Sequence, residues 1–404
     1  MKLSQSTLAL FLALACAANG AQARSAGVPL LGPSLDGASV FAAAYASTGA
    51  NSTVVGNILS GGIATTGAHS LVNGGIVSIG AANIGGGAAA VTGSLVSGGV
   101  ATMGAGAVLG GNLLSAGAAS IGANALVRGN MLSNGAATTG DASWVGGDVR
   151  SGGAATIGAN ATVVGKVQAV GAITLSASST THGTGALAAQ PLVGAIRTNV
   201  QAESQQVGAA QAALKNMRQG SALGSTMTLD TTLYPGVFTA ASLSTTAGIT
   251  LTLDGQNGRN QAWVFNIDDY LVTGAAMKIV LINADASNSV IWNSGGYASL
   301  GAGGTFIGTI LAQDYISVGA GTSVTGVGSA CGGVFSATSY VSTGDGARIG
   351  GNGCSGTGSG FEIVDGTAVR IGNLQAVPEP STCAMLAAGL ALLGVMRQRK
   401  RARQ

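Results

Sequence analysis

Charged side chains are scarce in this 404-residue chain, because Asp, Glu, Lys and Arg together make up only 8% of it. Aromatic residues account for 4%, so large rings cannot fill an extensive core. The two histidines and four cysteines do not have the spacing of a metal site. Much of the net charge of +3 sits in one terminal cluster, so no basic surface suited to nucleic acid is expected. Metal-dependent chemistry, bound cofactors and nucleic-acid partners are therefore not expected.

Glycine is abundant instead, with 69 residues. Much glycine with little charge is also typical of disordered low-complexity segments. Disordered segments, however, have low hydrophobicity, whereas 47% of this chain is apolar. We therefore expect a folded chain whose interior is filled by Ala, Val, Ile and stacked Ser or Thr.

An 18-residue repeat runs through the first half of the chain. The opening glycines are Gly56, Gly74, Gly93, Gly111, Gly129, Gly147 and Gly165, with one 19-residue step. Within each repeat apolar and polar residues alternate, which is the period of a β-strand. A fixed period with no room for a helix predicts stacked coils of three short strands. Seven coils about 4.8 Å apart would make a rod about 34 Å long.

A second glycine recurs six positions after the first, as at Gly80, Gly99 and Gly117. Glycine at a fixed place in a strand repeat suits a corner. We expect the backbone there to adopt a conformation that a side chain would forbid.

Residues 186–220 predict one long α-helix. From Pro191 to Arg218 the apolar residues recur three, four or seven positions apart. Pro191 suits the first turn and Gly220 the end. We expect the apolar stripe to pack along a face of the β-helix. The alternative, a membrane surface, is disfavoured by the Gln-rich and nearly uncharged polar side.

The coil pattern returns after this helix. Segments of the form Tyr-x-(Ser/Val)-x-Gly begin at Tyr270, Tyr297, Tyr315 and Tyr340, and they align with Ala118-Ala119-Ser120-Ile121-Gly122 of the repeats. Tyr297 and Tyr315 are again 18 positions apart. We therefore predict one all-β solenoid in which the helix is an inserted excursion.

Both ends of the chain have the pattern of sorting signals. Residues 1–23 combine Lys2, an apolar run and Ala21-Gln22-Ala23, which predicts a secretory signal peptide cut by signal peptidase. Residues 377–404 combine Pro378-Glu379-Pro380, a 14-residue apolar run and a basic end. That run is short for a spanning helix, although flanking arginines can snorkel, so we expect transient membrane association.

The tail resembles the PEP-CTERM sorting signal, whose Pro378, Glu379 and Pro380 motif is followed by a helix and basic residues. The resemblance implies a Gram-negative bacterium, processing by an exosortase, and delivery to the cell surface or extracellular matrix. The alternative reading is a simple membrane anchor.

Cys331 and Cys354 are the two cysteines that lie outside both predicted signals. In an oxidising compartment two such thiols are expected to form one disulfide. It would close a loop that interrupts the coil pattern.

Five motifs occur in order in the second half. They are Tyr-Pro-Gly-Val-Phe at 234–238, Leu-Thr-Leu-Asp-Gly at 251–255, Trp-Val-Phe-Asn-Ile at 263–267, Val-Ile-Trp-Asn at 290–293 and Gly-Thr-Ile-Leu-Ala at 308–312. Over residues 186–350 they resemble the ice-binding-protein-like family (DUF3494). Residues 35–57 also resemble the start of that family's sequences. The resemblance implies a right-handed β-helix with one long α-helix packed alongside. It also implies binding to ice or, as for some members, adhesion.

The predicted layout therefore has six parts. They are a signal peptide (1–23), N-terminal β-helix repeats (24–185), a packing α-helix (186–220), a C-terminal β-helix (221–355), a linker (356–376) and the sorting tail (377–404).

An outward column of small polar residues is the first candidate ligand face. It consists of Thr65, Asn83, Thr102, Ser120, Thr138, Thr156 and Thr174. Ala, Val or Ile stands two residues before each, so the face carries methyls and hydroxyls and almost no charge. A regular, rigid strip of this kind suits the ordering of water against ice. The alternative is that Thr merely forms and stabilises strands.

The second candidate face lies in the C-terminal half and consists of Tyr297, Ser299, Tyr315, Ser317, Tyr340 and Ser342. Bulky rings would interrupt a flat match to ice and suit stacking on the sugars of an extracellular polysaccharide, or packing on a protein. Cross-strand stabilisation is the alternative. The sequence therefore leaves ice binding and a structural or adhesive role in a biofilm matrix both open.

No catalytic constellation is evident, so we expect a protein that is not an enzyme. Asp268 and Asp269 are neighbouring carboxylates of the type that some polysaccharide-degrading enzymes use. A turn before a strand explains them more simply.

Overall fold

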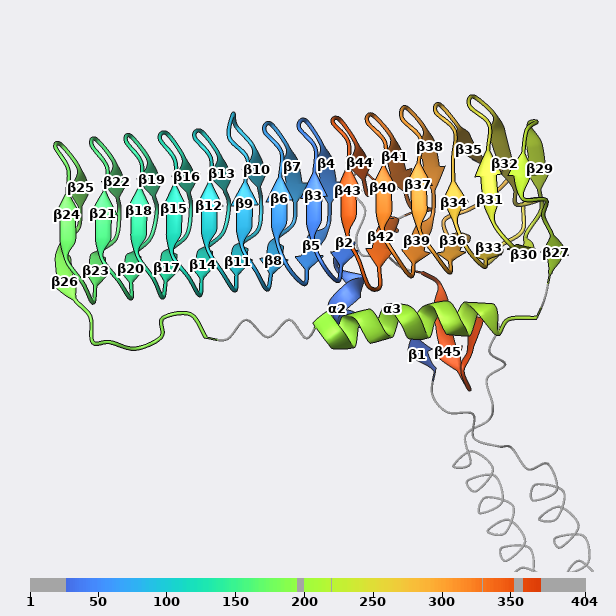
Figure 1. Ribbon diagram of the computed structural model, residues 1–404, viewed down its shortest axis with the longest axis horizontal. Helices are drawn as coiled ribbons and strands as arrows, with labels where there is room; N and C mark the ends of the chain where they lie inside the picture. The colour runs from blue at the N-terminus through green and yellow to red at the C-terminus, as the bar shows by residue number, and fades with distance from the viewer. Residues whose placement is uncertain (1–26, 195–199, 219, 329, 352–358, 372–404) are drawn as a thin grey trace, which may run out of the picture. The chain divides into compact units, whose positions relative to one another are not determined.

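The computed structural model describes residues 27–194, 200–218, 220–328, 330–351 and 359–371. Residues Val28–Arg370 form one body, a long stack of coils (Figure 1). Each coil gives one strand to each of three parallel sheets, which we call sheet B, sheet C and sheet D and which have 15, 14 and 14 strands. The expected β-helix-like solenoid is thus confirmed.

Sheet B contains, from one end of the stack to the other, β26 (Thr184–Ala186), β23 (Val167–Ala169), β20 (Val149–Ser151), β17 (Met131–Ser133), β14 (Leu113–Ser115), β11 (Leu95–Ser97), β8 (Ile76–Ser78), β5 (Asn57–Ser60), β2 (Ala38–Ala42), β42 (Gly333–Ser336), β39 (Thr309–Ala312), β36 (Ser289–Ser294), β33 (Ala262–Ile267), β30 (Gly236–Ala240) and β27 (Ser221–Ala222).

Sheet C contains, in the same direction, β24 (Ile173–Leu175), β21 (Ala155–Ile157), β18 (Ala137–Thr139), β15 (Ala119–Ile121), β12 (Ala101–Met103), β9 (Ala82–Ile84), β6 (Ala64–Thr66), β3 (Ala46–Thr48), β43 (Val341–Thr343), β40 (Ile316–Val318), β37 (Ala298–Leu300), β34 (Leu271–Val272), β31 (Leu243–Thr245) and β28 (Thr226–Met227).

Sheet D contains β25 (Thr180–Thr181), β22 (Thr162–Val163), β19 (Trp144–Val145), β16 (Leu126–Val127), β13 (Val108–Leu109), β10 (Ala90–Val91), β7 (Leu71–Asn73), β4 (Thr53–Val55), β44 (Arg348–Ile349), β41 (Ser323–Thr325), β38 (Thr305–Ile307), β35 (Lys278–Ile282), β32 (Thr250–Asp254) and β29 (Thr231–Leu233).

The first coil lies in the middle of this stack, not at one end. The first coil, β2 to β4, pairs with the last coil, β42 to β44, as in the pairs Ser47 with Ser342 and Thr53 with Arg348. We call this junction the seam (Figure 1). From the seam the N-terminal coils run outward to β26, and the C-terminal coils run inward from β27. The predicted helix excursion lies between the two halves in sequence, and its segment joins the two far ends of the stack, β26 and β27.

Coil length differs between the two halves. In the N-terminal half Leu113 pairs with Met131, 18 positions later. In the C-terminal half Trp263 pairs with Val290, 27 positions later, while Ile291 pairs with Thr309 after 18. The added residues of the longer coils form the connections between strands, including residues 255–261 and 283–288.

The second glycine column marks a point where successive backbones touch. A Cβ on Gly80 would lie 2.8 Å from the carbonyl oxygen of Gly62, and one on Gly117 2.8 Å from that of Gly99. Neither Gly80 nor Gly117 has a positive φ. The expectation that a special backbone conformation requires glycine at these positions was therefore wrong. The preceding coil itself excludes a side chain. Ser115 uses the same corner, where its Oγ donates to the carbonyl of Gly99 at 2.7 Å.

Replacing Gly117 by Ala should therefore destabilise the body. The added methyl forces two coils apart, and overpacking of this kind costs about 1–3 kcal/mol. Denaturant unfolding of residues 28–370 measures the change. The control is Gly208→Ala in the helix, where nothing lies within 4 Å, and it should be neutral or stabilising by up to about 1 kcal/mol. Equal stabilities for the two variants would contradict the close-approach explanation.

Helix α3 spans Val200–Lys215 and is shorter than the expected 186–220. Residues 187–194 are not helical. Their backbone is held instead by the side chain of Asn134, which accepts from the N–H groups of Leu192 and Val193 at 2.8 Å and donates to the carbonyl of Val193 at 2.8 Å. A short helix, α2 (Pro33–Asp36), precedes the first coil.

The apolar side of α3 packs on the outer face of sheet B in the C-terminal half. Val207 and Leu214 are buried in one cluster with Val264, Ile291 and Leu311. The expected packing along a long face of the β-helix is what the structure shows.

Buried amides fix the helix to this face. Asn293 donates to the carbonyl of Gln211 at 3.0 Å and to Oδ1 of Asn266 at 2.8 Å, and Asn266 donates to the carbonyl of Leu214 at 2.8 Å. The asparagines of the sequence motifs at 263–267 and 290–293 therefore dock the helix.

Asn293→Ala should lower the free energy of unfolding by about 1–3 kcal/mol, because it removes two buried donors. Gln201, which is exposed on the same helix, provides the control, and Gln201→Ala should change the stability by less than about 0.5 kcal/mol. Chemical unfolding followed by circular dichroism measures both. An Asn293→Ala variant as stable as the control would show that the amides do not hold the helix.

Residues that were expected to form a linker contain a hairpin. Strands β45 (Phe361–Val364) and β46 (Thr367–Arg370) pair antiparallel, and β1 (Val28–Pro29) pairs with β45. Asp365 and Gly366 have φ angles of 49° and 73°, which is the pattern of a type I′ turn. The linker prediction was wrong over residues 361–370 because this Asp-Gly signal between alternating residues was not recognised.

Every strand that the structure describes, and both core clusters, lie within Val28–Arg370. This body therefore contains the packing that it needs to fold on its own.

Candidate functional site

The outer face of sheet C carries one unbroken column of small residues. Pairing joins the C-terminal and N-terminal halves through Ser342, Ser47 and Thr65. We call this the hydroxyl column, and in order along the stack it consists of Thr226, Ser244, Val272, Ser299, Ser317, Ser342, Ser47, Thr65, Asn83, Thr102, Ser120, Thr138, Thr156 and Thr174. The two candidate faces of the sequence are therefore parts of one face.

The residues of this column point outward, as the flanking residues are buried in the inner coils. Thr102, for example, is half-buried between the buried Ala101 and Met103. Thr138 and Thr174 are exposed, whereas the other candidate residues are half-buried. Neighbours also bond along the column, as Thr102 donates from Oγ1 to Oδ1 of Asn83.

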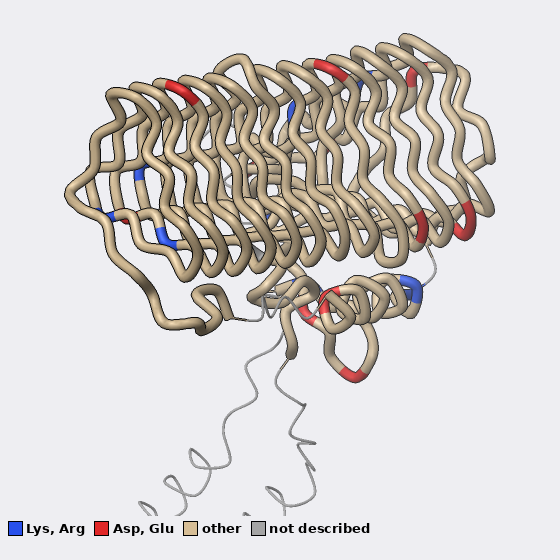
Figure 2. Tube along the Cα trace, turned by 60° about the vertical axis from the view of Figure 1, so that its left-hand side comes forward, with Lys and Arg blue, Asp and Glu red and all other residues tan. Residues whose placement is uncertain are grey.

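Sheet C differs from the other two large sheets in charge. None of its strands contains Asp, Glu, Lys or Arg. Sheet D contains Lys278, Arg348 and Asp254, and sheet B contains Arg150. Figure 2 shows how few charged residues the coils carry. Sheet B is also covered by α3 in its C-terminal half, so sheet C is the long open face without charge.

A ladder of tyrosines runs beside the hydroxyl column. Its members, which we call the Tyr ladder, are Tyr270, Tyr297, Tyr315, Tyr340 and Tyr45. Adjacent ring centroids are 4.7 to 5.5 Å apart, and the planes differ by 8 to 20°. Tyr45, which is 43% exposed, was missed because only the seam places it next to Tyr340. In the coil after Tyr45 the same position is held by Ile63, and in the later coils it is held by the Ala and Val residues of the repeats.

The three inner tyrosines of the ladder do not offer ring faces for sugars to stack on. Tyr297, Tyr315 and Tyr340 each have a ring stacked on both faces, so their ring edges are what remains open. Cross-strand stacking accounts for the ladder. The geometry thus removes the argument from sugar stacking that favoured a polysaccharide ligand.

Stacking also changes the acidity of the ladder. Burial, with smaller effects of Tyr297, Tyr340 and Asp314, raises the pKa of Tyr315 above its usual value. Burial likewise raises the pKa of Tyr340, with Tyr45 and Asp314 adding to it. The folded state therefore favours the neutral phenols.

The stability that the neutral phenols contribute should be complete below the unfolded-state pKa of about 10 and be lost as pH rises through the higher folded-state pKa. Replacing both Tyr315 and Tyr340 by Phe keeps the rings and removes these ionisations. The double variant should lose less stability than the parent between about pH 9 and about pH 11. Thermal unfolding across this range measures the difference, and identical pH profiles would contradict the proposed coupling.

The other predicted residues do not form a reactive centre. Asp268 forms an ion pair with Lys215 of α3 at 3.1 Å. Within the described part of the chain, no three His, Cys, Asp or Glu side chains group as metal ligands. Cys331 is buried and disulfide-bonded, while Cys354 lies outside the described residues.

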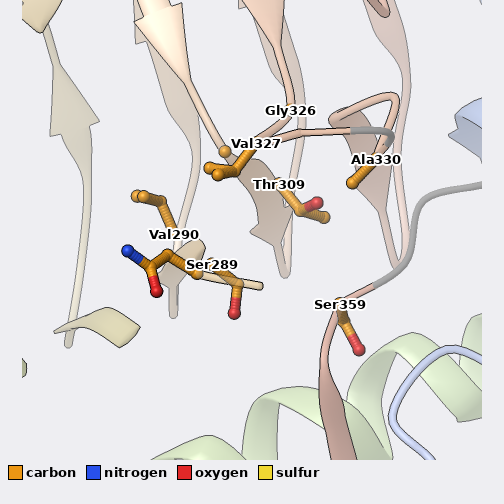
Figure 3. Close-up of a pocket in the computed structure, with 9 residues that line it drawn as sticks. Ser289, Val290, Thr309, Gly326, Val327, Ala330 and Ser359 are labelled. Atoms are coloured by element: carbon orange, nitrogen blue, oxygen red, sulfur yellow. The ribbon is translucent and has the colours of Figure 1, made fainter. Parts of the chain in front are cut away.

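A small pocket lies near the loop that precedes Cys331 (Figure 3). Its volume is about 10 Å³, and its lining includes Ser289, Thr309, Val327 and Ser359. That volume holds about one water molecule, so the pocket is too small for an organic ligand.

Pro378, Glu379, Pro380 and the predicted signal peptide also lie outside the described residues. Among the residues that the structure describes, no helix has the length and hydropathy to cross a membrane.

Comparison with protein families identifies two segments. Residues 178–343 match the Ice-binding-like family, and residues 376–401 match the PEP-CTERM protein-sorting motif. The first match covers α3 and most of the C-terminal coils.

Curated relatives match over about a quarter of the chain. An ice-binding protein of Nostoc sp. (strain HG1) is 40% identical over 93 residues, which are 23% of this chain and 34% of that protein. Ice-binding protein 1 of Shewanella frigidimarina (strain NCIMB 400) is 35% identical over 96 residues, which are 23% of this chain and 11% of that protein. The chain thus spans about a third or less of the length of these relatives.

A search of solved structures matches this chain to an ice-binding protein of Antarctomyces psychrotrophicus and to the DUF3494 domain of Shewanella frigidimarina ice-binding protein 1. The first is 23% identical with a TM-score of 0.33, and the match covers 50% of this chain and 90% of that one. The second is 21% identical with a TM-score of 0.32, and the match covers 50% and 92%. From the family matches and the curated relatives, the chain carries an ice-binding-like domain together with a PEP-CTERM sorting motif.

Proposed function

We propose that the exported protein binds ice through the outer face of sheet C. The observation that carries this proposal is the hydroxyl column, which continues across the seam through all 14 strands of the sheet and has Ser or Thr at every position except Val272 and Asn83. The ice-binding-like domain supports ice as the ligand, and the sorting motif indicates export to the cell surface or beyond.

The regularity of the face is the physical basis of the proposal. Parallel strands repeat every 4.8 Å or so, and each adds one small polar residue and one small apolar residue in the N-terminal half. The backbone hydrogen bonds between coils hold these side chains in place before any contact with ice. Binding therefore needs little further ordering of the protein.

The absence of charge on this face supports the same assignment. A charged side chain keeps its own hydration shell, and removing that shell costs more than removing water from a hydroxyl or methyl group. Sheet D has Lys278 and Arg348 in the equivalent outward column, whereas the strands of sheet C have no charged residue.

The Tyr ladder limits where the contact is flattest. Its rings stand beside the C-terminal part of the hydroxyl column, whereas Ala118, Ala136 and Ala154 stand beside the N-terminal part. We therefore assign the main contact to the N-terminal coils, around Ser120, Thr138 and Thr156.

The remaining features of export and winding belong to the same proposal. The coils wind in the right-handed sense, signal peptidase removes residues 1–23, and an exosortase acts at the tail that contains Pro378, Glu379 and Pro380. Cys331 pairs with Cys354. The tail associates with the membrane only until it is removed.

The double variant Thr138→Tyr with Thr156→Tyr tests the face. Two rings would stand above the flat N-terminal contact and hold ice away from the neighbouring hydroxyls. Inhibition of ice recrystallisation by residues 28–370 should fall about tenfold or more, which corresponds to about 1.4 kcal/mol of binding free energy.

Thr162→Tyr serves as the matched control, because Thr162 holds the outward position of β22 in sheet D. This variant should retain the parent activity. Equal losses in both variants, or none in the sheet C variant, would show that sheet C is not the binding face. A parent protein with no effect on ice would contradict ice binding itself.

A further inference from the structure

Both ends of the rod leave interior positions uncovered. Leu175 pairs with the buried Ile157, yet it is 42% exposed because no coil follows β24. At the opposite end Met227 of β28 and Leu223 are only partly buried, although they pack against the core. At both ends, apolar side chains thus face solvent at positions that are buried in the inner coils.

The terminal strands also present free backbone groups. In a parallel pair, alternate residues of a strand use their N–H and C=O toward one neighbour. The carbonyl of Gly183 and the N–H of Leu187 are bonded to β23, so Thr184 and Ala186 direct theirs to the open side of β26. At β28 the carbonyls of Ser225 and Met227 accept hydrogen bonds from the N–H groups of Ser244 and Thr246. The backbone N–H and C=O of Thr226 therefore face the open side at this end of the rod.

These two open edges are complementary, because all coils in the stack wind in the same order along one axis. The end at β24 to β26 is where a following coil would add, and the end at β27 to β29 is where a preceding coil would add. The seam shows that this pairing needs no covalent connection. There, β2 to β4 stack on β42 to β44 although Ser47 and Ser342 are far apart in sequence.

Features that normally protect such edges are absent from the parts of these two ends that the structure describes. Natural sheets block open edges with charges or covering elements, and solenoids carry polar capping repeats. Residues 167–194 contain no Asp, Glu, Lys or Arg, and residues 220–253 contain only Asp230. Among the described residues, no helix lies over either set of terminal strands in Figure 1.

We propose that a second copy of this chain stacks head to tail on the first, with β24 to β26 of one copy pairing with β27 to β29 of the next. The contact repeats the seam between two molecules. It is heterologous, so it leaves one free end of each kind and permits chains of rods. The inference does not depend on ice binding, although stacking would extend the hydroxyl column from one copy to the next.

Two end variants test the proposal in the body formed by residues 28–370. Leu175→Lys places a charge over one end, and Met227→Lys places one over the other. Leu71→Lys is the matched control, because Leu71 is 41% exposed on the side of the rod in sheet D. Sedimentation velocity gives the size of the particles and electron microscopy their length, each over a wide range of protein concentration.

The parent and the Leu71→Lys control should form particles whose lengths are multiples of one rod, which is about 70 Å for 15 strands. Each end variant alone should stay monomeric, because its partner end is blocked on every copy. An equal mixture of the two should form dimers about 140 Å long and nothing longer, since only one compatible pair of ends remains.

Other outcomes would overturn the proposal. A parent that remains monomeric at every concentration excludes stacking. Dimers that persist in either end variant alone indicate contact between like ends or through the side of the rod. Circular dichroism of each variant checks that the coils are intact. If Leu175→Lys fails to fold it is replaced by Ala186→Lys, at an exposed position of β26, and if Met227→Lys fails to fold it is replaced by Ser221→Lys, at an exposed position of β27.

Discussion

Each coil of this protein rests directly on the backbone of the coil before it. Hydrogen bonds run from coil to coil in three sheets, and at corners such as Gly117 there is no room for even a methyl group. The interior is consequently narrow, so Ala and Ser serve where a globular protein would use larger residues. The even spacing of the outer columns follows from this close contact.

The seam joins the two halves of the chain into one continuous stack. Since the first coil completes the last, neither half ends at the middle of the rod, and one hydrophobic core runs through both. The C-terminal half adds an aromatic interior, with Phe265 and Trp292 stacked at 3.8 Å. It also carries α3 on sheet B, held by Asn266 and Asn293. That cover on one sheet leaves sheet C open along its whole length.

Much of the fold could be read from local patterns, because a strand alternates its side chains and a repeat returns them to the same place. The outward position of Thr102 and Thr138 follows from this alternation alone. The seam could not be read in this way, since Tyr45 and Tyr340 lie at opposite ends of the sequence and nothing in the repeat period connects them. Helix α3 starts later than its apolar pattern suggests because Asn134 binds the backbone of Leu192 and Val193. The Asp365-Gly366 turn could have been predicted from its local sequence, but the many other glycines of the chain made this signal hard to distinguish.

Slow growth of a single ice crystal from a dilute solution of residues 28–370 shows whether this body binds ice. A protein that binds ice becomes incorporated into the crystal, whereas other solutes are rejected into the liquid. We expect the ice to contain the protein at or above its concentration in the liquid. Rejection of the protein to the same extent as an inert control protein would contradict it.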